Sequence, residues 1–194
     1  MFLALKGRVT HIGRLHMHAH EMARQPGIFL LTEAEKKAWT AQRTACQRSV
    51  ELHRDARSSG RTVGVHGQHD VNREFELAQR ALHIADHVLR NAHIVSPASD
   101  ATLVDIGVEV TYQRYDERSN ALGKPETVFV GGHGSTDTRA KPPIMPYDSL
   151  ILVSLLGCRV GASKTIRLAN GKLNDVEVLD IRLPAAYPEL RLVA

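Results

Sequence analysis

The sequence of residues 71–92 reads V-N-R-E-F-E-L-A-Q-R-A-L-H-I-A-D-H-V-L-R-N-A. Its apolar residues recur at alternating spacings of four and three, the pattern of a helix that packs along one seam against another helix. These seam positions are Val71, Phe75, Ala78, Leu82, Ala85, Leu89 and Ala92. Asp70 stands where an N-cap is expected, so the pattern predicts a helix from Asp70 to about Ala92.

A second amphipathic segment precedes this helix in the chain. It opens with T-E-A-E, where Thr32 and Glu35 have the spacing of a capping box. A weaker seam, interrupted by Arg48, follows at Ala34, Ala38, Ala41, Ala45 and Leu52. Two helices of about twenty residues each, at 1.5 Å per residue, make a rod of about 30–40 Å. We therefore predict an antiparallel coiled-coil hairpin over residues 31–96.

Residues 58–69 join the two predicted helices. They contain Gly60, Gly64 and Gly67 and few core residues, which predicts an exposed loop. Such a loop is either a passive connection or the functional tip of a rigid rod that enters a narrow binding site on a partner.

After Pro97 the apolar period changes to two, which places a second domain at residues 97–194. Strands are predicted at 108–112, 127–130, 165–168 and 176–181, and Asn170-Gly171 is a hairpin turn. Residues 147–157 read as a short capped helix that ends at Gly157. Strands grouped around one helix predict an α+β fold.

Composition is that of a globular protein: 194 residues, 43% hydrophobic and 24% charged, with a formal net charge of +4. The basic excess lies in the N-terminal half, together with ten of the eleven histidines. This half is the side expected to face a polyanion, although the excess is too small to indicate binding to duplex DNA. Residues 1–30 are predicted to be a basic, His-rich, poorly ordered extension. The two cysteines, Cys46 and Cys158, form no metal or disulfide framework, which suits a reducing cytoplasm.

Residues 67–78 read G-Q-H-D-V-N-R-E-F-E-L-A. This segment resembles the tip of the GreA/GreB family of transcription elongation factors, whose pattern is G-D-x-x-E-N-A-E-Y-x-x-A. The framework matches at Gly67, Asn72, Glu74, Phe75 and Ala78. The two acids of the family pattern fall on Gln68 and Val71.

The second half of the chain resembles the FKBP-like C-terminal domain of the same family. The family helix S-P-[LIM]-A-x-A-L-[IL]-G-[KR] is echoed by D-S-L-I-L-V-S-L-L-G at residues 148–157. Val160-Gly161, Asn170-Gly171-Lys172 and Phe129-Val130-Gly131-Gly132 follow the family order as well. The resemblance covers about residues 31–183. The shared fold does not imply prolyl isomerase activity.

The resemblance implies an accessory factor, not an enzyme, that binds core RNA polymerase at the secondary channel and modulates elongation. In the family the tip acids help hold the Mg²⁺ that activates water for cleavage of backtracked RNA. Gln68 and Val71 supply no anionic oxygen, so we predict no catalytic residue and no strong stimulation of cleavage. The second helix is also one heptad shorter than in the family, which shortens the rod by about 10 Å. The tip residues expected to carry function are Gln68, His69, Asp70, Val71, Asn72, Glu74 and Phe75.

Other surfaces are expected to contact the polymerase. A stripe of basic residues at helical spacing is a candidate to face polymerase or nucleic acid. Indirect contact with nascent RNA is left open. A solvated helix face is the commoner explanation for such a stripe. Its members are Arg73, Arg80, His83, His87 and Arg90. The exposed face around Gly131 to Tyr147 is expected to grip the channel rim. The protein is expected to be a cytoplasmic monomer without membrane contact.

Two other functions remain open. Asp70 and Glu74 could replace the missing acids in a cleavage-stimulating factor that contacts polymerase-bound Mg²⁺, although Asp70 serves equally well as a helix cap. The histidines at 66 and 69, and at 16, 18 and 20, have spacings suited to a transition metal in an interaction module unrelated to polymerase. No cysteine lies near them, so we predict no bound metal and no intrinsic cofactor.

Overall fold

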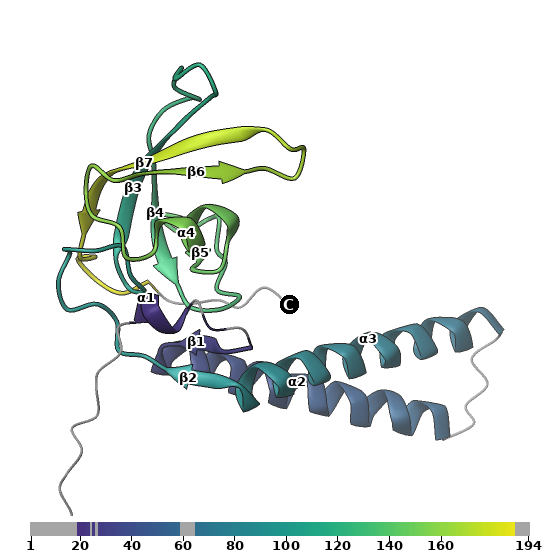
Figure 1. The fold of residues 1–194 in the computed structure, drawn as a ribbon. Coiled ribbons are helices and arrows are strands. Elements are labelled where there is room, and N and C mark those ends of the chain that lie inside the picture. The colour runs from purple at the N-terminus through teal and green to yellow at the C-terminus, as the bar shows by residue number, and fades with distance from the viewer. Residues whose placement is uncertain (1–18, 24, 26, 59–64, 189–194) are drawn as a thin grey trace, which may run out of the picture.

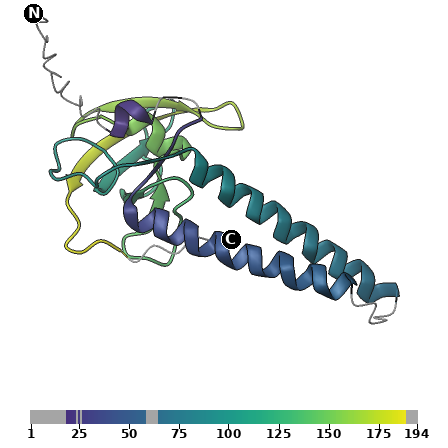
Figure 2. The ribbon, with the colours of Figure 1, turned by 90° about the horizontal axis from the view of Figure 1, so that it is seen from below.

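A helical hairpin projects from an α+β body in the computed structural model, which describes residues 19–23, 25, 27–58 and 65–188 (Figures 1 and 2). The predicted α+β class is confirmed. The hairpin consists of α2 (Glu33–Ser58) and α3 (Val65–Arg90), which lie side by side in both views. Each helix has 26 residues and is therefore about 39 Å long at 1.5 Å per residue.

The seam predicted for the second helix is the packed face of α3. All seven seam positions are buried or half-buried, and Ala85 is fully buried. The start of this helix was predicted wrongly, because α3 begins at Val65 and not after Asp70. Gly67 lies within the first turns of the helix, where it costs only about 1 kcal/mol and does not stop the helix. The predicted 58–69 loop is thus shortened, and residues 59–64 lie outside the described residues.

The seam predicted for the first helix is wrong by one position. Ala34, Ala41, Ala45 and Leu52 are exposed. The face that is buried or half-buried instead carries Glu35, Trp39, Gln42, Cys46, Val50 and His53. Larger side chains such as Trp39 and Val50 bury more apolar area than alanines, so the helix turns these residues toward α3.

The base of the hairpin is tied to the chain that precedes it. Strand β1 (Phe29–Leu31) pairs in parallel with β2 (Ala92–Ile94), which directly follows α3. Leu30 and Leu31 are fully buried, and the short helix α1 (Ala19–Met22) packs on the body. The predicted boundary at residue 30 therefore cuts through β1, while residues 1–18 lie outside the described residues.

The body is a five-stranded sheet of order β5-β4-β3-β7-β6. Its strands are β3 (Glu109–Tyr115), β4 (Glu126–Gly131), β5 (Ile144–Pro146), β6 (Ser163–Arg167) and β7 (Leu173–Arg182). The four strands predicted after residue 97 are confirmed as β3, β4, β6 and β7. All neighbouring strands are antiparallel except β4 and β5, which are parallel.

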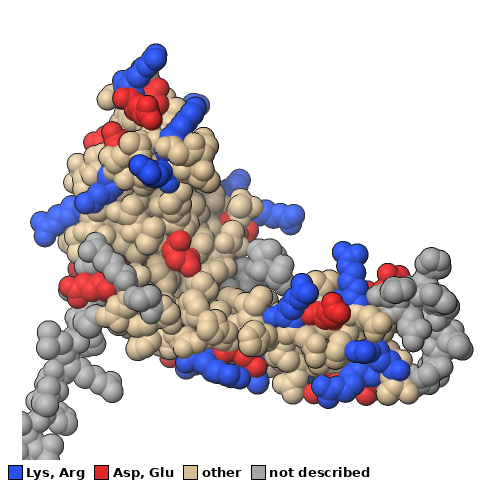
Figure 3. Space-filling view, turned by 45° about the vertical axis from the view of Figure 1, so that its right-hand side comes forward, with Lys and Arg blue, Asp and Glu red and all other residues tan. Residues whose placement is uncertain are grey.

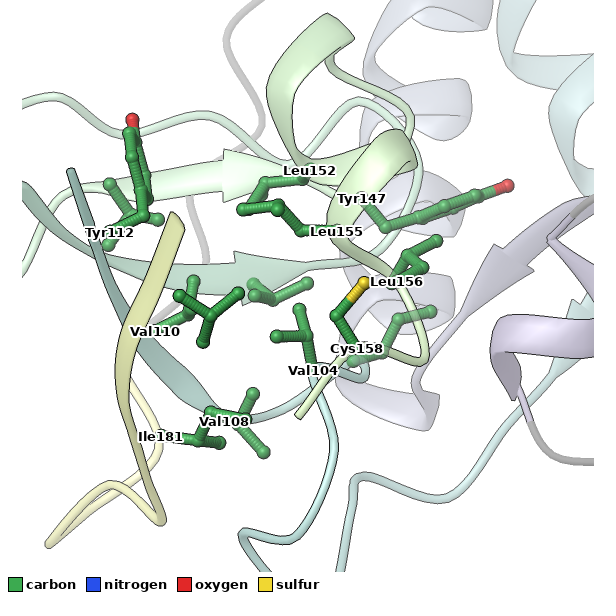
Figure 4. Packing of buried hydrophobic residues seen from close by; sticks show 14 of the residues in the cluster. Val104, Val108, Val110, Tyr112, Tyr147, Leu152, Leu155, Leu156, Cys158 and Ile181 are labelled. Carbon is green, nitrogen blue, oxygen red and sulfur yellow. The ribbon is translucent and has the colours of Figure 1, made fainter. Parts of the chain in front are cut away.

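Helix α4 (Leu150–Leu155) covers this sheet. Side chains of α4 meet those of β3 and β7 in the core, among them Leu152, Leu155, Val110 and Ile181 (Figure 4). The Ser149 hydroxyl caps the helix by accepting from the Leu152 N–H. The helix stop at Gly157 and the hairpin turn at Gly171 are confirmed, and both glycines have a positive φ, 75° and 80°.

Within the described residues, no helix combines the length and the apolar character needed to span a membrane.

Candidate functional site

The tip segment forms the first turns of α3, and before Asp70 only its backbone is described. Gln68 and His69 are therefore on a helix, while the arrangement of their side chains lies outside the described residues. The histidines at positions 16, 18, 20 and 66 also have no described side chain. Among the described residues, no three His, Cys, Asp or Glu side chains gather closely enough to hold a metal ion.

Two of the predicted tip residues are carboxylates, Asp70 and Glu74. Both are exposed, and the spacing of four residues puts them on the same face of α3, about 5–6 Å apart at Cβ. Glu74 Oε2 lies 3.7 Å from Nδ1 of His53 on α2. These two acids share an exposed face of α3, from which they could approach a cation.

The other tip residues hold the hairpin together. Val71, Asn72 and Phe75 are half-buried, and Val71 belongs to the seam that faces α2. The guanidinium of Arg57 lies 4.9 Å from the centre of the Phe75 ring, a cation–π contact between the two helices. The second acid position of the family pattern is thus occupied here by a packing residue.

The predicted basic stripe is exposed along its whole length, and Figure 3 shows Lys and Arg interleaved with acids on the rod. Its members are Arg73, Arg80, His83, His87 and Arg90. His87 lies at the base of the rod, where its ring meets Phe29 edge to face with centroids 5.4 Å apart. The stripe therefore runs from the tip to the base.

Asp86 offsets part of this positive charge. Arg43 Nε donates to Asp86 Oδ1 at 2.5 Å, and Arg90 lies 3.8 Å from the other carboxylate oxygen. The hydrogen bond from Arg43 lowers the pKa of Asp86, and the positive charges of Arg43 and Arg90 lower it further. Part of the positive charge near the base of the rod is therefore neutralised by Asp86.

Glu35 joins the rod to the body, a role that its sequence position alone does not reveal. The capping box is confirmed: Glu35 Oε2 accepts from the Thr32 N–H at 2.7 Å, and Thr32 Oγ1 accepts from the Glu35 N–H at 3.3 Å. The same carboxyl group, fully buried, accepts through Oε1 from the Gly132 N–H at 2.5 Å and from the Ser135 hydroxyl at 2.6 Å. One side chain thus caps α2 and binds the loop after β4.

Aromatic contacts surround this junction. Trp39 Nε1 donates to the carbonyl of His133 at 3.3 Å, and the His133 ring lies against Phe29 with centroids 4.2 Å apart. His133 Nδ1 is 2.6 Å from Asp148 Oδ2. The Tyr147 hydroxyl accepts from the Leu30 N–H at 3.2 Å. Helix α2, strand β1 and the body are therefore fixed against one another.

This packing corrects the expectation that the face from Gly131 to Tyr147 is exposed. Gly131, Gly132, Ser135 and Tyr147 are buried against the base of the rod. Gly132 has no room for a side chain, since a Cβ there would lie 2.1 Å from Glu35 Oε2. Of the segment, residues 138, 139, 141 and 143 are exposed and remain available to a partner.

An apolar cavity of about 290 Å³ borders the junction. It is lined by the start of α2 and by Phe129 and Tyr187. The rings of Phe129 and Tyr187 are nearly perpendicular, with centroids 6.2 Å apart.

No protein-family model and no curated protein matches the chain. Solved structures do show similarity. GreA factor homolog 1 (Gfh1) of Thermus thermophilus is 19% identical, with 80% of this chain and 99% of that chain covered at a TM-score of 0.33. Gfh1 of Thermus aquaticus gives the same values. A GreA/GreB transcription elongation factor from Nitrosomonas europaea is 18% identical, with 55% of this chain and 85% of that chain covered at a TM-score of 0.33.

Proposed function

We propose that this protein is a Gre-like accessory factor that binds RNA polymerase at the secondary channel and modulates elongation without strongly stimulating transcript cleavage. The observation that carries the proposal is the tip: Gln68 and Val71 stand at the two acid positions of a GreA/GreB-like framework. Val71 packs in the seam between α2 and α3, so this position is built for the hairpin and not for a metal.

The architecture supports the same function. A hairpin of two helices, each about 39 Å long, projects from the body and has an exposed basic stripe. We assign the hairpin as an antiparallel coiled coil and the body as FKBP-like. A narrow rod of this kind can enter a channel lined by acidic groups or nucleic acid, to which Arg73 and Arg80 would be attracted. The factor would act as a monomer in the cytoplasm.

A transcript-cleavage assay on arrested polymerase complexes tests this function. The protein alone is expected to leave the RNA uncleaved, and in competition it is expected to reduce cleavage by an active Gre factor. A double variant with Arg73→Glu and Arg80→Glu should compete less well, whereas Lys124→Glu on an exposed loop of the body is the matched control. Absence of an effect in both arms would refute the proposal.

A cleavage-stimulating factor is the second candidate. The observation in its favour is that Asp70 and Glu74 share one exposed face at the outer end of the rod, where two carboxylates at this spacing can approach one cation. If the protein alone stimulates cleavage and Asp70→Asn abolishes this activity, the second candidate replaces the first.

A further inference from the structure

The apolar cavity of about 290 Å³ lies where three parts of the molecule meet. The start of α2 contributes Ala34, and the body contributes Ile106 and Phe129. The third part is the segment after β7, residues 183–188, whose Tyr187 and Pro188 line the cavity as well. An apolar group inside the cavity would therefore contact the rod and the body together.

The floor of the cavity is on the side of β4 that is turned away from the main core. Val128 and Val130 belong to the core cluster and Phe129 does not, because successive side chains of a strand point to opposite faces. Phe129 is nevertheless only 5% exposed, and the ring of Tyr187 packs against it. This face of the sheet thus has an apolar site of its own, which the segment after β7 helps to cover.

Charges around the cavity restrict what it can bind. Among its described lining residues, Glu33 and Glu35 are the charged ones. The Glu35 carboxyl group already accepts four hydrogen bonds, from Thr32, Gly132 and Ser135, so it needs no further partner. Glu33 is exposed, which puts it at the mouth. An apolar group next to a positive charge fits these walls, whereas an anionic ligand would be repelled.

The chain itself supplies such a group directly after Pro188. Residues 189–194, which lie outside the described residues, read E-L-R-L-V-A. We call them the tail. Side chains alternate along an extended chain, so in an extended tail Leu190 and Leu192 would share the side of Pro188, and Arg191 would be on the opposite side. Two residues of extended chain span about 7 Å, which is the reach of Leu190 beyond Pro188.

We propose that the cavity binds the tail of the same chain, with Leu190 inside the cavity and Leu192 across its mouth. An apolar cavity of about 150 Å³ holds one benzene molecule, which is about as large as a leucine side chain. The cavity described here has nearly twice that volume, so one leucine can enter it and a second can close it. Arg191, turned outward, then approaches Glu33 at the mouth.

The position of the tail in the chain favours it over a separate partner. Because the tail continues from a wall of the cavity, its leucines are present there at a high effective concentration without any association step. A separate apolar partner would have to displace them.

The tail would connect the rod to the body at a further place. Glu35 joins α2 to Gly132, and the Leu30 N–H joins β1 to Tyr147. Leu190 would touch the rod and the body at once, through Ala34 and Phe129. An apolar side chain of another protein could enter the cavity only after the tail has left it, so the tail would also control access to the junction.

Disulfide formation in the full chain tests where the tail binds. In the double variant with Ala34→Cys and Leu190→Cys, mild oxidation is expected to join the two introduced cysteines, because the bound tail brings positions 34 and 190 together. The matched control has Ala41→Cys and Leu190→Cys, since position 41 is also exposed on α2 and lies about 10 Å further along the helix. Leu190→Cys alone controls for bonds to Cys46 and Cys158, which are half-buried and buried.

A neutral fluorescent probe, N-phenyl-1-naphthylamine, tests whether the tail fills the cavity. Leu190→Asp is expected to bind the probe about tenfold more tightly than the wild type, because burial of one leucine side chain changes an equilibrium by about this factor or more. Val193→Asp makes the same change of charge on the opposite side of an extended tail, so it should behave like the wild type. Adding Ala34→Phe to Leu190→Asp should remove the gain, which places the probe in this cavity.

Two results would overturn the inference. One is a disulfide yield at position 34 that does not exceed the yield at position 41, as expected for a tail without a binding site. The other is equal affinity of the probe for the wild type and Leu190→Asp, which would show a cavity open to other apolar molecules. Neither experiment contains polymerase, so the proposed function is not affected by either outcome.

Discussion

Replacing Glu35 by alanine tests whether one buried carboxyl group couples the rod to the body. Glu35 is fully buried and accepts four hydrogen bonds, from the N–H and hydroxyl of Thr32, the N–H of Gly132 and the hydroxyl of Ser135. In Glu35→Ala the two hydroxyls can rotate toward other acceptors. The two backbone N–H groups cannot, because they stay in place and remain buried.

The magnitude follows from these two orphaned donors. A buried donor that loses its partner costs about 1–3 kcal/mol, so two of them cost about 2–6 kcal/mol. We expect the free energy of unfolding to fall by about 4 kcal/mol, a large fraction of the 5–15 kcal/mol that is typical of a folded protein. Glu33→Ala is the control, since Glu33 is an exposed acid in the same helical turn and should cost only about 0.3–1 kcal/mol through the helix dipole.

Denaturant unfolding followed by two probes measures this effect. Trp39 is the only tryptophan and lies at the junction, so its fluorescence reports on this part of the molecule, while circular dichroism reports on the whole. In Glu35→Ala both midpoints should fall, and the fluorescence transition should come first. Midpoints within the range of the Glu33→Ala control would refute the assignment of Glu35 as the coupling residue.

Three further predictions follow from particular contacts. Gly132→Ala should destabilise the protein about as much as Glu35→Ala, since its Cβ would overlap Glu35 Oε2; an unchanged denaturation midpoint would contradict this. Val71→Glu places an acid at a position where the GreA/GreB pattern has one. It should lower the stability of the hairpin by about 1–3 kcal/mol, because it buries part of a carboxylate in the seam, and it should give no cleavage activity. A stable, cleavage-active variant would show that position 71 is open to a metal. Asp86→Asn should lower the free energy of unfolding above about pH 4, where Asp86 is ionised and its interaction with Arg43 stabilises the folded state. As the pH falls below that value, the difference from the wild type should disappear, because the carboxylate of the wild type becomes protonated. A difference that is constant from pH 7 to pH 3 would exclude this explanation.

The sequence predicted elements whose signals are local. The seam of α3, the strands β3, β4, β6 and β7 and the capped helix α4 are each encoded within a few neighbouring residues, and all are present. The turn at Asn170-Gly171 was predictable for the same reason, because glycine adopts the positive φ that the turn needs. Residues in these segments have one consistent pattern of apolar positions, so propensity and packing agree.

The first helix shows where this reasoning fails. Its alanines recur at the spacing of a seam, yet Trp39, Cys46 and Val50 form the face that packs on α3. Two periodic patterns coexist in α2, shifted by one residue, and a sequence cannot decide between them. The choice depends on how much apolar surface each pattern can bury against α3 and the body. The pattern with the larger side chains buries more apolar area.

The candidate site also has features that the sequence predicted and features that it did not. The sequence by itself determined the hairpin, the basic stripe on α3 and the identity of the tip residues, since each depends on spacing along one helix. Only the tertiary structure decided that Val71 packs inward, that Glu35 binds Gly132 and Ser135, nearly a hundred residues away, and that the face from Gly131 to Tyr147 is covered. Such contacts join segments with no local relation to one another, and they exist only once the chain has brought the rod and the body together.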